Sequence, residues 1–392
     1  MKILAATFDS EMSGGANRSF LMVITGLRDY YKHEVHVIIP NHGPLEEELV
    51  RNGFSYECVK LKTVGTQLSD TPKRIFTKLK GNYLAIDHYL KARKYARKCR
   101  DEKYDIVYIN CANHLFACYV ARLLGIPYVW HFRGMFLPSH YYVYNQKRLY
   151  NAPEARIIVI SNQMKNALPK IAGINEKQIV MIHNGMPQLA VTPANQDWEN
   201  GVVHCVLCGR IVKSKGHLDA INALGILKNR GYRDIFLHIA GDVSTAAPQY
   251  KAVLKQAIEH NGVAEQVIFE GQIQDMATFR EYMNIELMCA VCEPFGRVTV
   301  EGMRSGLIVI GSNTGGTVDI IQDGYNGYLY QQGNSTDLAD KIQHVIDNVE
   351  ESKTIVQNAI AFSASHFTME KNVAEINAVL VECAEKYTNF VD

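Results

Sequence analysis

The sequence predicts an α/β protein with two Rossmann-like, doubly wound domains that face a cleft, and three observations support this. Short runs rich in Val and Ile alternate with longer segments of helical periodicity, which is the pattern of parallel sheets covered by helices. The chain has 392 residues, more than one hydrophobic core usually organises. A turn-rich segment, residues 187–201, interrupts the alternation, which then starts again.

Each half of the chain contains six strand candidates separated by helix-like segments. In the first half they are Ile3–Thr7, Glu34–Ile39, Ile106–Asn110, Tyr128–His131, Ile157–Ile160 and Val180–Ile182. In the second half they are Val202–Cys208, Ile235–Ala240, Val267–Glu270, Leu287–Val291, Leu307–Gly311 and Tyr328–Tyr330. We therefore place the domain boundary at the interrupting segment, with a first domain of residues 1–187 and a second from residue 188.

The composition is typical of a soluble globular protein. A formal net charge of +1 gives no overall attraction to nucleic acid, so we expect no nucleic-acid partner. The first ten residues lack the apolar core of a signal peptide, and no run reaches the roughly 18 apolar residues of a membrane span. Nine scattered cysteines suit a reducing compartment, so we expect a cytoplasmic protein.

Two cysteine pairs have the spacing of zinc ligands, Cys205 with Cys208 and Cys289 with Cys292. Residues three apart in a strand point to opposite faces, so neither pair converges on a metal without a break in its strand. We expect buried thiols and no metal site.

The segment from Lys73 to Lys103 is strongly basic, with eleven Lys or Arg against three acidic residues and apolar residues interleaved. A basic amphipathic segment of this kind can lie on an anionic membrane, on the inner face of the cell membrane in this case. Two helices with solvated outer faces would give the same pattern. Both interpretations stay open at this point.

The most informative motif follows the strand candidate Leu287–Val291. Glu293 and Glu301 bracket a loop and the start of a helix that we expect near Val298. Ligands of open α/β sheets bind at the carboxyl ends of strands, where helix N-termini offer N–H groups to anions. A carboxylate suits paired sugar hydroxyls and the loop N–H groups suit a phosphate. Alternatively, Glu301 only favours a helix N-terminus.

Two further strand ends carry suitable groups. Arg210 and Lys215 stand on the turn after the first strand of the second half, where fixed cations can neutralise a leaving diphosphate. Gly14 and Gly15, with Ser13, follow the first strand of the chain and would let the backbone approach a phosphate, although a plain tight turn explains them as well.

Together these motifs resemble glycosyltransferase family 4, the retaining enzymes of the GT-B fold. Glu293 and Glu301 match the paired glutamates of the family, Arg210 and Lys215 its Arg and Lys, and Gly14 and Gly15 its first glycine-rich loop. The remaining matching stretches are 183–185, 240–242, 271–272 and 312–316, so the resemblance covers nearly the whole chain.

The resemblance implies a role for each site residue. Arg210 and Lys215 would grip the donor diphosphate, Glu301 the ribose hydroxyls and Glu293 the transferred sugar. His131 would face the donor sugar. The other donor-binding positions implied are Gly14, Gly15, Gly241, Phe295, Gly296, Arg297 and Val298. Val243 and Arg297 depart from the commonest family pattern.

The family also implies a topology and a mechanism. The second domain would end at residue 369, and a C-terminal helix within 370–392 would join the first domain. No metal or other cofactor is needed, and the acceptor hydroxyl attacks on the face that the diphosphate leaves, with no protein nucleophile. UDP is the commonest nucleotide of the donor.

The acceptor would dock on the first domain, where Arg133, Tyr141, Tyr142 and Tyr144 follow His131. With the basic segment, this favours a saccharide or lipid-linked saccharide in cell-surface polysaccharide or glycolipid synthesis. A sugar-nucleotide epimerase or hydrolase on the same fold and a catalytically silent scaffold remain alternatives. A dehydrogenase is disfavoured because no G-x-G-x-x-G follows a strand.

Overall fold

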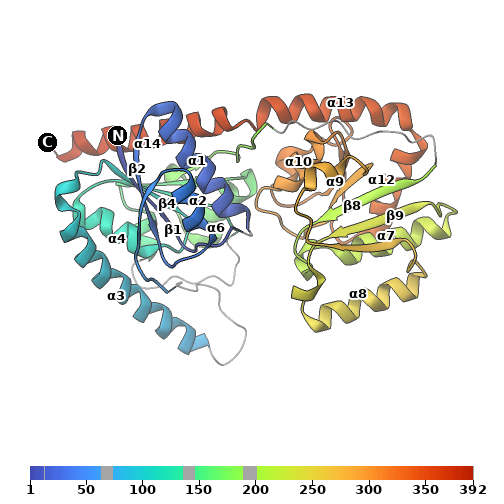
Figure 1. Ribbon diagram of the computed structural model, residues 1–392, viewed down its shortest axis with the longest axis horizontal. Coiled ribbons are helices and arrows are strands. Elements are labelled where there is room, and N and C mark those ends of the chain that lie inside the picture. Colours follow the sequence, from blue (N-terminus) through green and yellow to red (C-terminus); the bar gives the residue numbers. More distant parts are fainter. Residues whose placement is uncertain (13, 63–73, 136–145, 189–200, 392) are drawn as a thin grey trace. The chain divides into compact units, whose positions relative to one another are not determined.

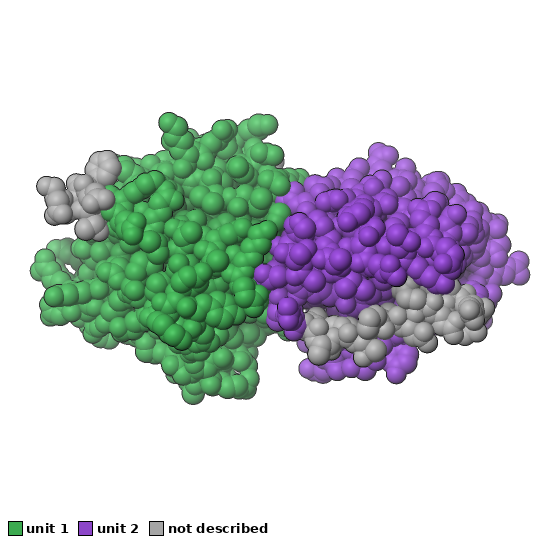
Figure 2. Space-filling model, turned by 90° about the horizontal axis from the view of Figure 1, so that it is seen from above, with its two compact units in different colours: residues 1–185, 369–392 green, residues 186–368 purple. Residues whose placement is uncertain are grey.

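The computed structural model describes residues 1–12, 14–62, 74–135, 146–188 and 201–391 (Figure 1). It divides into two compact units, coloured separately in Figure 2. Unit 1 consists of Met1–Gly185 and Met369–Asp392, and unit 2 of Met186–Thr368. The chain thus leaves unit 1 two residues before the boundary that the sequence suggests, and returns one residue before the C-terminal segment expected there.

Over its described residues, unit 1 is a parallel sheet of seven strands with helices packed on it. The strands are β1 (Lys2–Thr7), β2 (Glu34–Ile39), β3 (Ser55–Cys58), β4 (Ile106–Asn110), β5 (Tyr128–Phe132), β6 (Ala155–Val159) and β7 (Ile179–Met181), in the order β3-β2-β1-β4-β5-β6-β7. The helices are α1 (Gly15–Tyr31), α2 (Pro44–Arg51), α3 (Arg74–Lys98), α4 (Leu115–Leu124), α5 (Gln146–Tyr150), α6 (Asn162–Ala172) and α14 (Met369–Val391).

The final helix α14 belongs to unit 1 because it packs closely on α1. A Cβ added to Gly26 of α1 would lie 2.5 Å from Cγ2 of Val373, so the two helices touch where only glycine fits. Ile376 and Leu380 of α14 join the same buried cluster as Phe20 of α1. Burying these apolar side chains stabilises the helix on the sheet and fixes the end of the chain in this unit.

The described part of unit 2, which leaves out residues 189–200, forms a second parallel sheet, of six strands. They are β8 (Val203–Cys208), β9 (Ile235–Ala240), β10 (Val267–Gly271), β11 (Ile285–Met288), β12 (Ile308–Ser312) and β13 (Tyr328–Tyr330), in the order β10-β9-β8-β11-β12-β13. The helices are α7 (His217–Asn229), α8 (Pro248–Asn261), α9 (Met276–Arg280), α10 (Arg297–Arg304), α11 (Thr317–Ile320), α12 (Ser335–Asp347) and α13 (Val349–His366).

The two ends of unit 2 are tied to each other. The N–H of Met186 donates to the carbonyl of Phe367 at 2.8 Å. Nη1 of Arg304, the last residue of α10, donates to the carbonyl of Met186 at 3.1 Å, and its Nη2 donates to that of Phe367 at 3.1 Å. One guanidinium therefore holds together the points where the chain enters and leaves the unit.

Both sheets confirm the predicted α/β class, with two local corrections. Strand β3 was not predicted, because Ser55–Cys58 lacks an apolar run and lies at the sheet edge. The strand expected over Leu287–Val291 is instead Ile285–Met288. It ends early because Val291 donates its N–H to the carbonyl of Ser214 at 2.9 Å, in a neighbouring loop rather than along the sheet.

Candidate active site

The strand order of unit 2 predicts a ligand crevice at the carboxyl ends of β8 and β11. Chain connections run from β8 to β9 and β10 on one side, and from β11 to β12 and β13 on the other. The carboxyl ends of β8 and β11 are therefore a topological switch point, where open α/β sheets bind their ligands. The loops that follow these strands, residues 209–216 and 289–296, carry the motifs singled out in the sequence.

The two loops are in direct contact. Gly216 has φ +72°, and a Cβ added there would lie 1.9 Å from the carbonyl oxygen of Cys289. Any other residue would force the loops apart. Gly241, after β9, is similarly restricted, since its Cβ would lie 2.1 Å from the carbonyl oxygen of Gly209.

This contact brings Lys215 and Glu293 together. Nζ of Lys215 donates to Oε2 of Glu293 at 2.6 Å, and both side chains are about one-fifth exposed (21% and 19%). The side chains lie 78 residues apart in the sequence. Arg210, on the same turn as Lys215, is exposed. The crevice therefore presents two cations and one carboxylate.

The loop after β12 holds the backbone of Glu293 in place. Gly316 donates its N–H to the carbonyl of Glu293 at 2.7 Å, and Oγ1 of Thr314 donates to that of Val291 at 2.9 Å. A Cβ on Gly316 would lie 2.6 Å from Cα of Phe295. The turn noted at 312–317 thus supports the glutamate loop by close packing.

Helix α10 begins beside this loop with an uncapped N-terminus. Gly296 precedes it at φ +102°, no side chain caps it, and its first turn contains no acidic residue. Phe295 is buried, with its ring 5.6 Å from that of Phe367. The N–H groups at the start of the helix and its positive dipole end are suited to an anion.

Glu301 lies in the second turn of α10, slightly later than the sequence suggests, and is held by two arginines. Nη2 of Arg280 lies 3.3 Å from its Oε2, and Nε of Arg297 lies 3.9 Å from its Oε1. Because the helix starts at Arg297, Glu301 lies beyond its first turn, where a carboxylate no longer interacts favourably with the N-terminal end of the helix dipole. Its carboxylate remains 23% exposed.

Arg280 was not singled out by the sequence, yet it organises this carboxylate. Its guanidinium is 2% exposed and also bonds Oε2 of Glu286, a fully buried residue of β11, at 2.8 Å. Burial raises the pKa of Glu286. Burial acts to lower the pKa of Arg280, but the neighbouring acidic groups, Glu286 first among them, together outweigh burial and the pKa is raised. Arg280 is thus a buried cation between two glutamates.

In unit 1, Gly14 and Gly15 stand at the N-terminus of α1, after β1. Gly14 occupies the N-cap position of α1, where no side chain caps the helix. Asn17 of the first turn accepts from Oγ1 of Thr7 at 2.6 Å and donates to Oδ1 of Asp9 at 2.6 Å. The glycines therefore lie at the switch point of the first sheet, between β1 and β4.

His131 is fully buried in β5. Its Nδ1 lies 2.7 Å from the hydroxyl of Tyr108 and 3.3 Å from Nη2 of Arg133, while its Nε2 has no partner among the described residues. Burial, and then the charge of Arg133, lower its pKa well below the usual value, so the ring is neutral. Arg133 is buried too, and donates to Asn110 at 2.5 Å and Asn184 at 2.7 Å.

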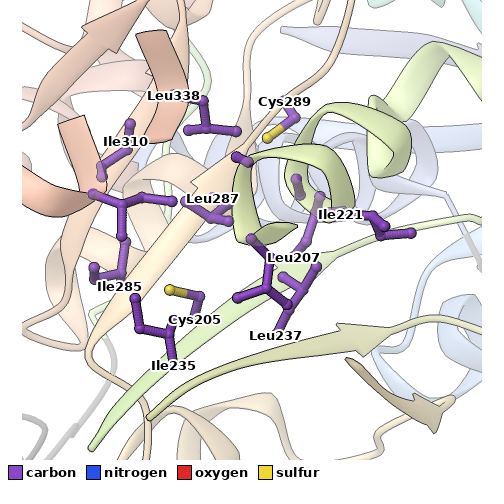
Figure 3. Packing of buried hydrophobic residues seen from close by; sticks show 14 of the residues in the cluster. Cys205, Leu207, Ile221, Ile235, Leu237, Ile285, Leu287, Cys289, Ile310 and Leu338 are labelled. Atoms are coloured by element: carbon purple, nitrogen blue, oxygen red, sulfur yellow. The ribbon is translucent and has the colours of Figure 1, made fainter. Parts of the chain in front are cut away.

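Several sequence predictions fall elsewhere. Ser13, Tyr141, Tyr142 and Tyr144 lie outside the described residues. Cys205 and Cys289 point into the apolar core of unit 2 (Figure 3). Within the described ranges, no group of three or more His, Cys, Asp or Glu side chains is arranged to hold a metal ion.

The chain matches two family models. Residues 13–187 match the model described as Glycosyltransferase Family 4, and residues 195–362 match that of the glycosyl transferases group 1. The chain belongs to the family 4 type of glycosyltransferases. The second match spans the switch-point crevice of unit 2, and the first spans the glycine loop and His131 of unit 1.

Curated relatives of this glycosyltransferase match it over parts of their length. One is an uncharacterized glycosyltransferase of Methanocaldococcus jannaschii, 27% identical over 230 residues, which are 59% of this chain and 60% of the relative. Another is the N-acetyl-alpha-D-glucosaminyl L-malate synthase of Bacillus anthracis, 27% identical over 146 residues, 37% of each chain. The alignments thus span less than two thirds of these two relatives.

Solved structures share the whole GT-B fold with this glycosyltransferase. Anabaena Alr3699/HepE in complex with UDP aligns with a TM-score of 0.79 and 22% identity over 97% of this chain and 100% of that one. A glycosyltransferase from Rickettsia africae aligns with a TM-score of 0.78 and 21% identity, covering 97% and 98%. At these identities the likeness establishes the fold alone.

Proposed function

We propose that this glycosyltransferase binds a nucleotide-diphosphate sugar, with UDP as the nucleotide, in the crevice of unit 2. The observation that carries the proposal is the Lys215–Glu293 pair at 2.6 Å, placed at the switch point beside the uncapped start of α10. Cations and a helix N-terminus suit a diphosphate, and a carboxylate suits sugar hydroxyls. The choice of UDP is supported by the Anabaena protein, which was crystallised in complex with that nucleotide.

The side chains divide between the parts of the donor. Arg210 and Lys215 bind the diphosphate, together with the N–H groups from Phe295 to Val298. Glu293 accepts hydrogen bonds from the transferred sugar, and Glu301 accepts them from the ribose. Gly241 after β9, and Gly14 with Gly15 after β1, supply closely approaching backbone at two strand ends.

We propose a retaining, metal-independent transfer. The bond from the anomeric carbon to the diphosphate oxygen breaks, and its electron pair leaves with the phosphate. The acceptor oxygen bonds the same carbon from the same face, and its proton passes to a phosphate oxygen. The two cations and the dipole of α10 stabilise the departing charge, the role otherwise taken by a metal ion.

The acceptor in this proposal is a saccharide or lipid-linked saccharide of cell-surface polysaccharide or glycolipid synthesis, bound by unit 1 through Arg133 and its neighbours. One curated relative, from Staphylococcus aureus, is named "Capsular polysaccharide biosynthesis glycosyltransferase CapM" and is 26% identical over 155 residues. His131 is proposed as a neutral hydrogen-bonding group near the reacting sugar. The protein would work in the cytoplasm, at the inner face of the membrane.

Calorimetric titration with UDP, GDP and ADP in the presence of a chelator tests the donor site. Wild type is compared with Glu301→Ala and with Arg210→Ala/Lys215→Ala, and Lys213→Ala, an exposed cation on the same turn, is the matched control. The proposal is supported if wild type and the control bind UDP with micromolar affinity and the first two variants do not. Wild type that binds no nucleotide refutes it.

Adding Mg²⁺ tests metal independence, since the affinity and the transfer rate should not change. The anomeric configuration of the product, read by NMR, tests retention. An inverted product refutes the proposed same-face attack.

A further inference from the structure

Helix α3 of unit 1 carries apolar side chains on two opposite faces. The sequence left open a pair of helices with solvated outer faces, but residues 74–98 form a single helix. Its inner face, which includes Leu84, Ala92 and Tyr95, is buried, and Tyr95 packs edge-on against Phe116 of α4 at 5.6 Å. This inner face alone explains why the helix packs on the unit.

The outer face of α3 is an exposed apolar stripe. Its members follow one another at intervals of three and four residues, which places them in one row on the helix. They are Phe76, Leu79, Tyr83, Ile86 and Leu90, and each is between 55% and 74% exposed. Isolated exposed apolar residues are common, whereas a row of five along four turns indicates a surface that binds something.

A pocket of about 480 Å³ opens beside the stripe. Ile86 and Tyr89 of α3 line it together with Tyr119 and Leu123 of α4, and Arg122 and Arg148 contribute guanidinium groups. Leu123 and Tyr89 are themselves exposed, by 40% and 42%. Stripe and pocket therefore form one apolar surface across α3 and α4, with cations beside it.

The charge of α3 identifies the occupant. Seven Lys or Arg and one acidic residue, Asp87, lie between Phe76 and Lys98. Asp87 pairs with Lys91 at 2.7 Å. The stripe continues directly into exposed Arg93, Lys94 and Arg97, at the same helical spacing. A second copy of this face would bring these cations against like charges, whereas an anionic bilayer offers both hydrocarbon and phosphate.

We propose that the α3–α4 face of unit 1 docks on an anionic phospholipid bilayer. The stripe enters the boundary between headgroups and acyl chains, the pocket takes acyl chain, and Arg93, Lys94 and Arg97 bind lipid phosphates. The peripheral location proposed above rests on this surface, but donor binding does not, because no proposed donor residue lies on α3 or α4. No described helix is long and apolar enough to span the membrane, so attachment through this face is interfacial.

Vesicle sedimentation tests the docking surface. Wild type should bind vesicles of phosphatidylcholine with one-third phosphatidylglycerol and not vesicles of phosphatidylcholine alone. Leu79→Ser/Ile86→Ser/Leu90→Ser should abolish binding. Arg93→Gln/Lys94→Gln/Arg97→Gln should weaken it about 100-fold, from about fivefold per cation near the surface. Lys165→Gln/Lys170→Gln/Lys177→Gln, which removes three exposed charges of unit 1 on and just after α6, should bind as wild type does.

Two further measurements keep the outcome clear. The changed side chains are exposed, so the variants should keep the wild-type melting temperature and bind UDP unchanged. Phe76→Trp should show blue-shifted fluorescence on the anionic vesicles, as expected for an indole entering the bilayer.

The proposal is overturned if wild type binds neither kind of vesicle, or if the stripe variant binds as wild type does. It is also overturned if wild type forms a dimer that does not bind vesicles and the stripe substitutions dissociate that dimer. The face is then an interface between copies of the chain. Unchanged UDP binding with lost vesicle binding leaves the donor site standing and separates the two proposals.

Discussion

Replacing Arg280 tests whether a buried cation positions the carboxylate of Glu301, which we propose binds the ribose of the donor. Arg280→Met removes the partner of Glu286, which is fully buried, and the contact to Glu301 at 3.3 Å. Breaking a buried ion pair from one side costs about 3 to 5 kcal/mol. The double variant Arg280→Met/Glu286→Leu leaves no unpaired buried charge, so most of that stability should return.

The two variants separate stability from ligand recognition. In both variants, the cation that Glu301 keeps among the described residues is the more distant Arg297, at 3.9 Å. We expect the double variant to unfold in urea near the wild-type midpoint but to bind UDP about tenfold more weakly, equivalent to about 1.4 kcal/mol. Arg280→Lys keeps the positive charge without the forked geometry of the guanidinium, so its affinity for UDP should lie between those of wild type and the double variant.

The decisive assay is a comparison of UDP with 2′-deoxyuridine diphosphate by calorimetry. Wild type should prefer the ribose form, and the double variant should lose most of that preference. If Arg280 only stabilises the fold, its replacement should weaken the binding of UDP and of 2′-deoxyuridine diphosphate equally. A folded double variant that keeps the wild-type preference would refute the positioning role.

Three other predictions concern the crevice and its surroundings. Lys215→Met should weaken UDP binding by at least tenfold, because a charge-assisted bond is worth about 1.5 to 3 kcal/mol; unaltered calorimetric affinity would contradict this. Gly316→Ala should lower the transfer rate and cost about 1 to 3 kcal/mol of stability, since the new Cβ would lie 2.6 Å from Cα of Phe295. Gly134→Ala, whose Cβ meets nothing within 4 Å, is its control, and equal rates for the two would count against the packing argument. His217 is fully buried and burial lowers its pKa to about 4, so only the unfolded chain takes up its proton between pH 6.5 and 4. The free energy of unfolding should therefore decrease as the pH is lowered through that window, by about 3 kcal/mol in total from this residue. The urea midpoint of His217→Phe should decrease less than that of wild type. An equal decrease would show that other groups cause it.

The strands were predictable where Val and Ile form continuous runs. Glu34–Ile39, Ile106–Asn110 and Ile235–Ala240 begin and end at the predicted residues. Residues 289–291 were misassigned to the strand because they continue its apolar pattern, although the chain turns away there and Val291 bonds Ser214. Sequence periodicity cannot show where a tertiary contact ends a strand.

The site shows the same division. Lys215 and Glu293 were expected near one ligand because both follow parallel strands, and the structure brings them into contact. Arg280 could not be found from the sequence, because its partner Glu286 falls just before the predicted strand Leu287–Val291, whereas the observed strand Ile285–Met288 buries it. The sequence showed apolar residues between the basic ones of α3, but not that they divide into a buried face and an exposed stripe.

The hydrogen bond between Met186 and Phe367 makes unit 2 a self-contained length of chain. The first and last residues of unit 2 lie next to each other, and its buried cluster consists of its own residues. The chain re-enters unit 1 at Met369. These are the conditions under which a domain tolerates excision or transplantation, because joining its ends requires little rearrangement. We therefore expect residues 186–368 to tolerate exchange for the corresponding unit of a relative.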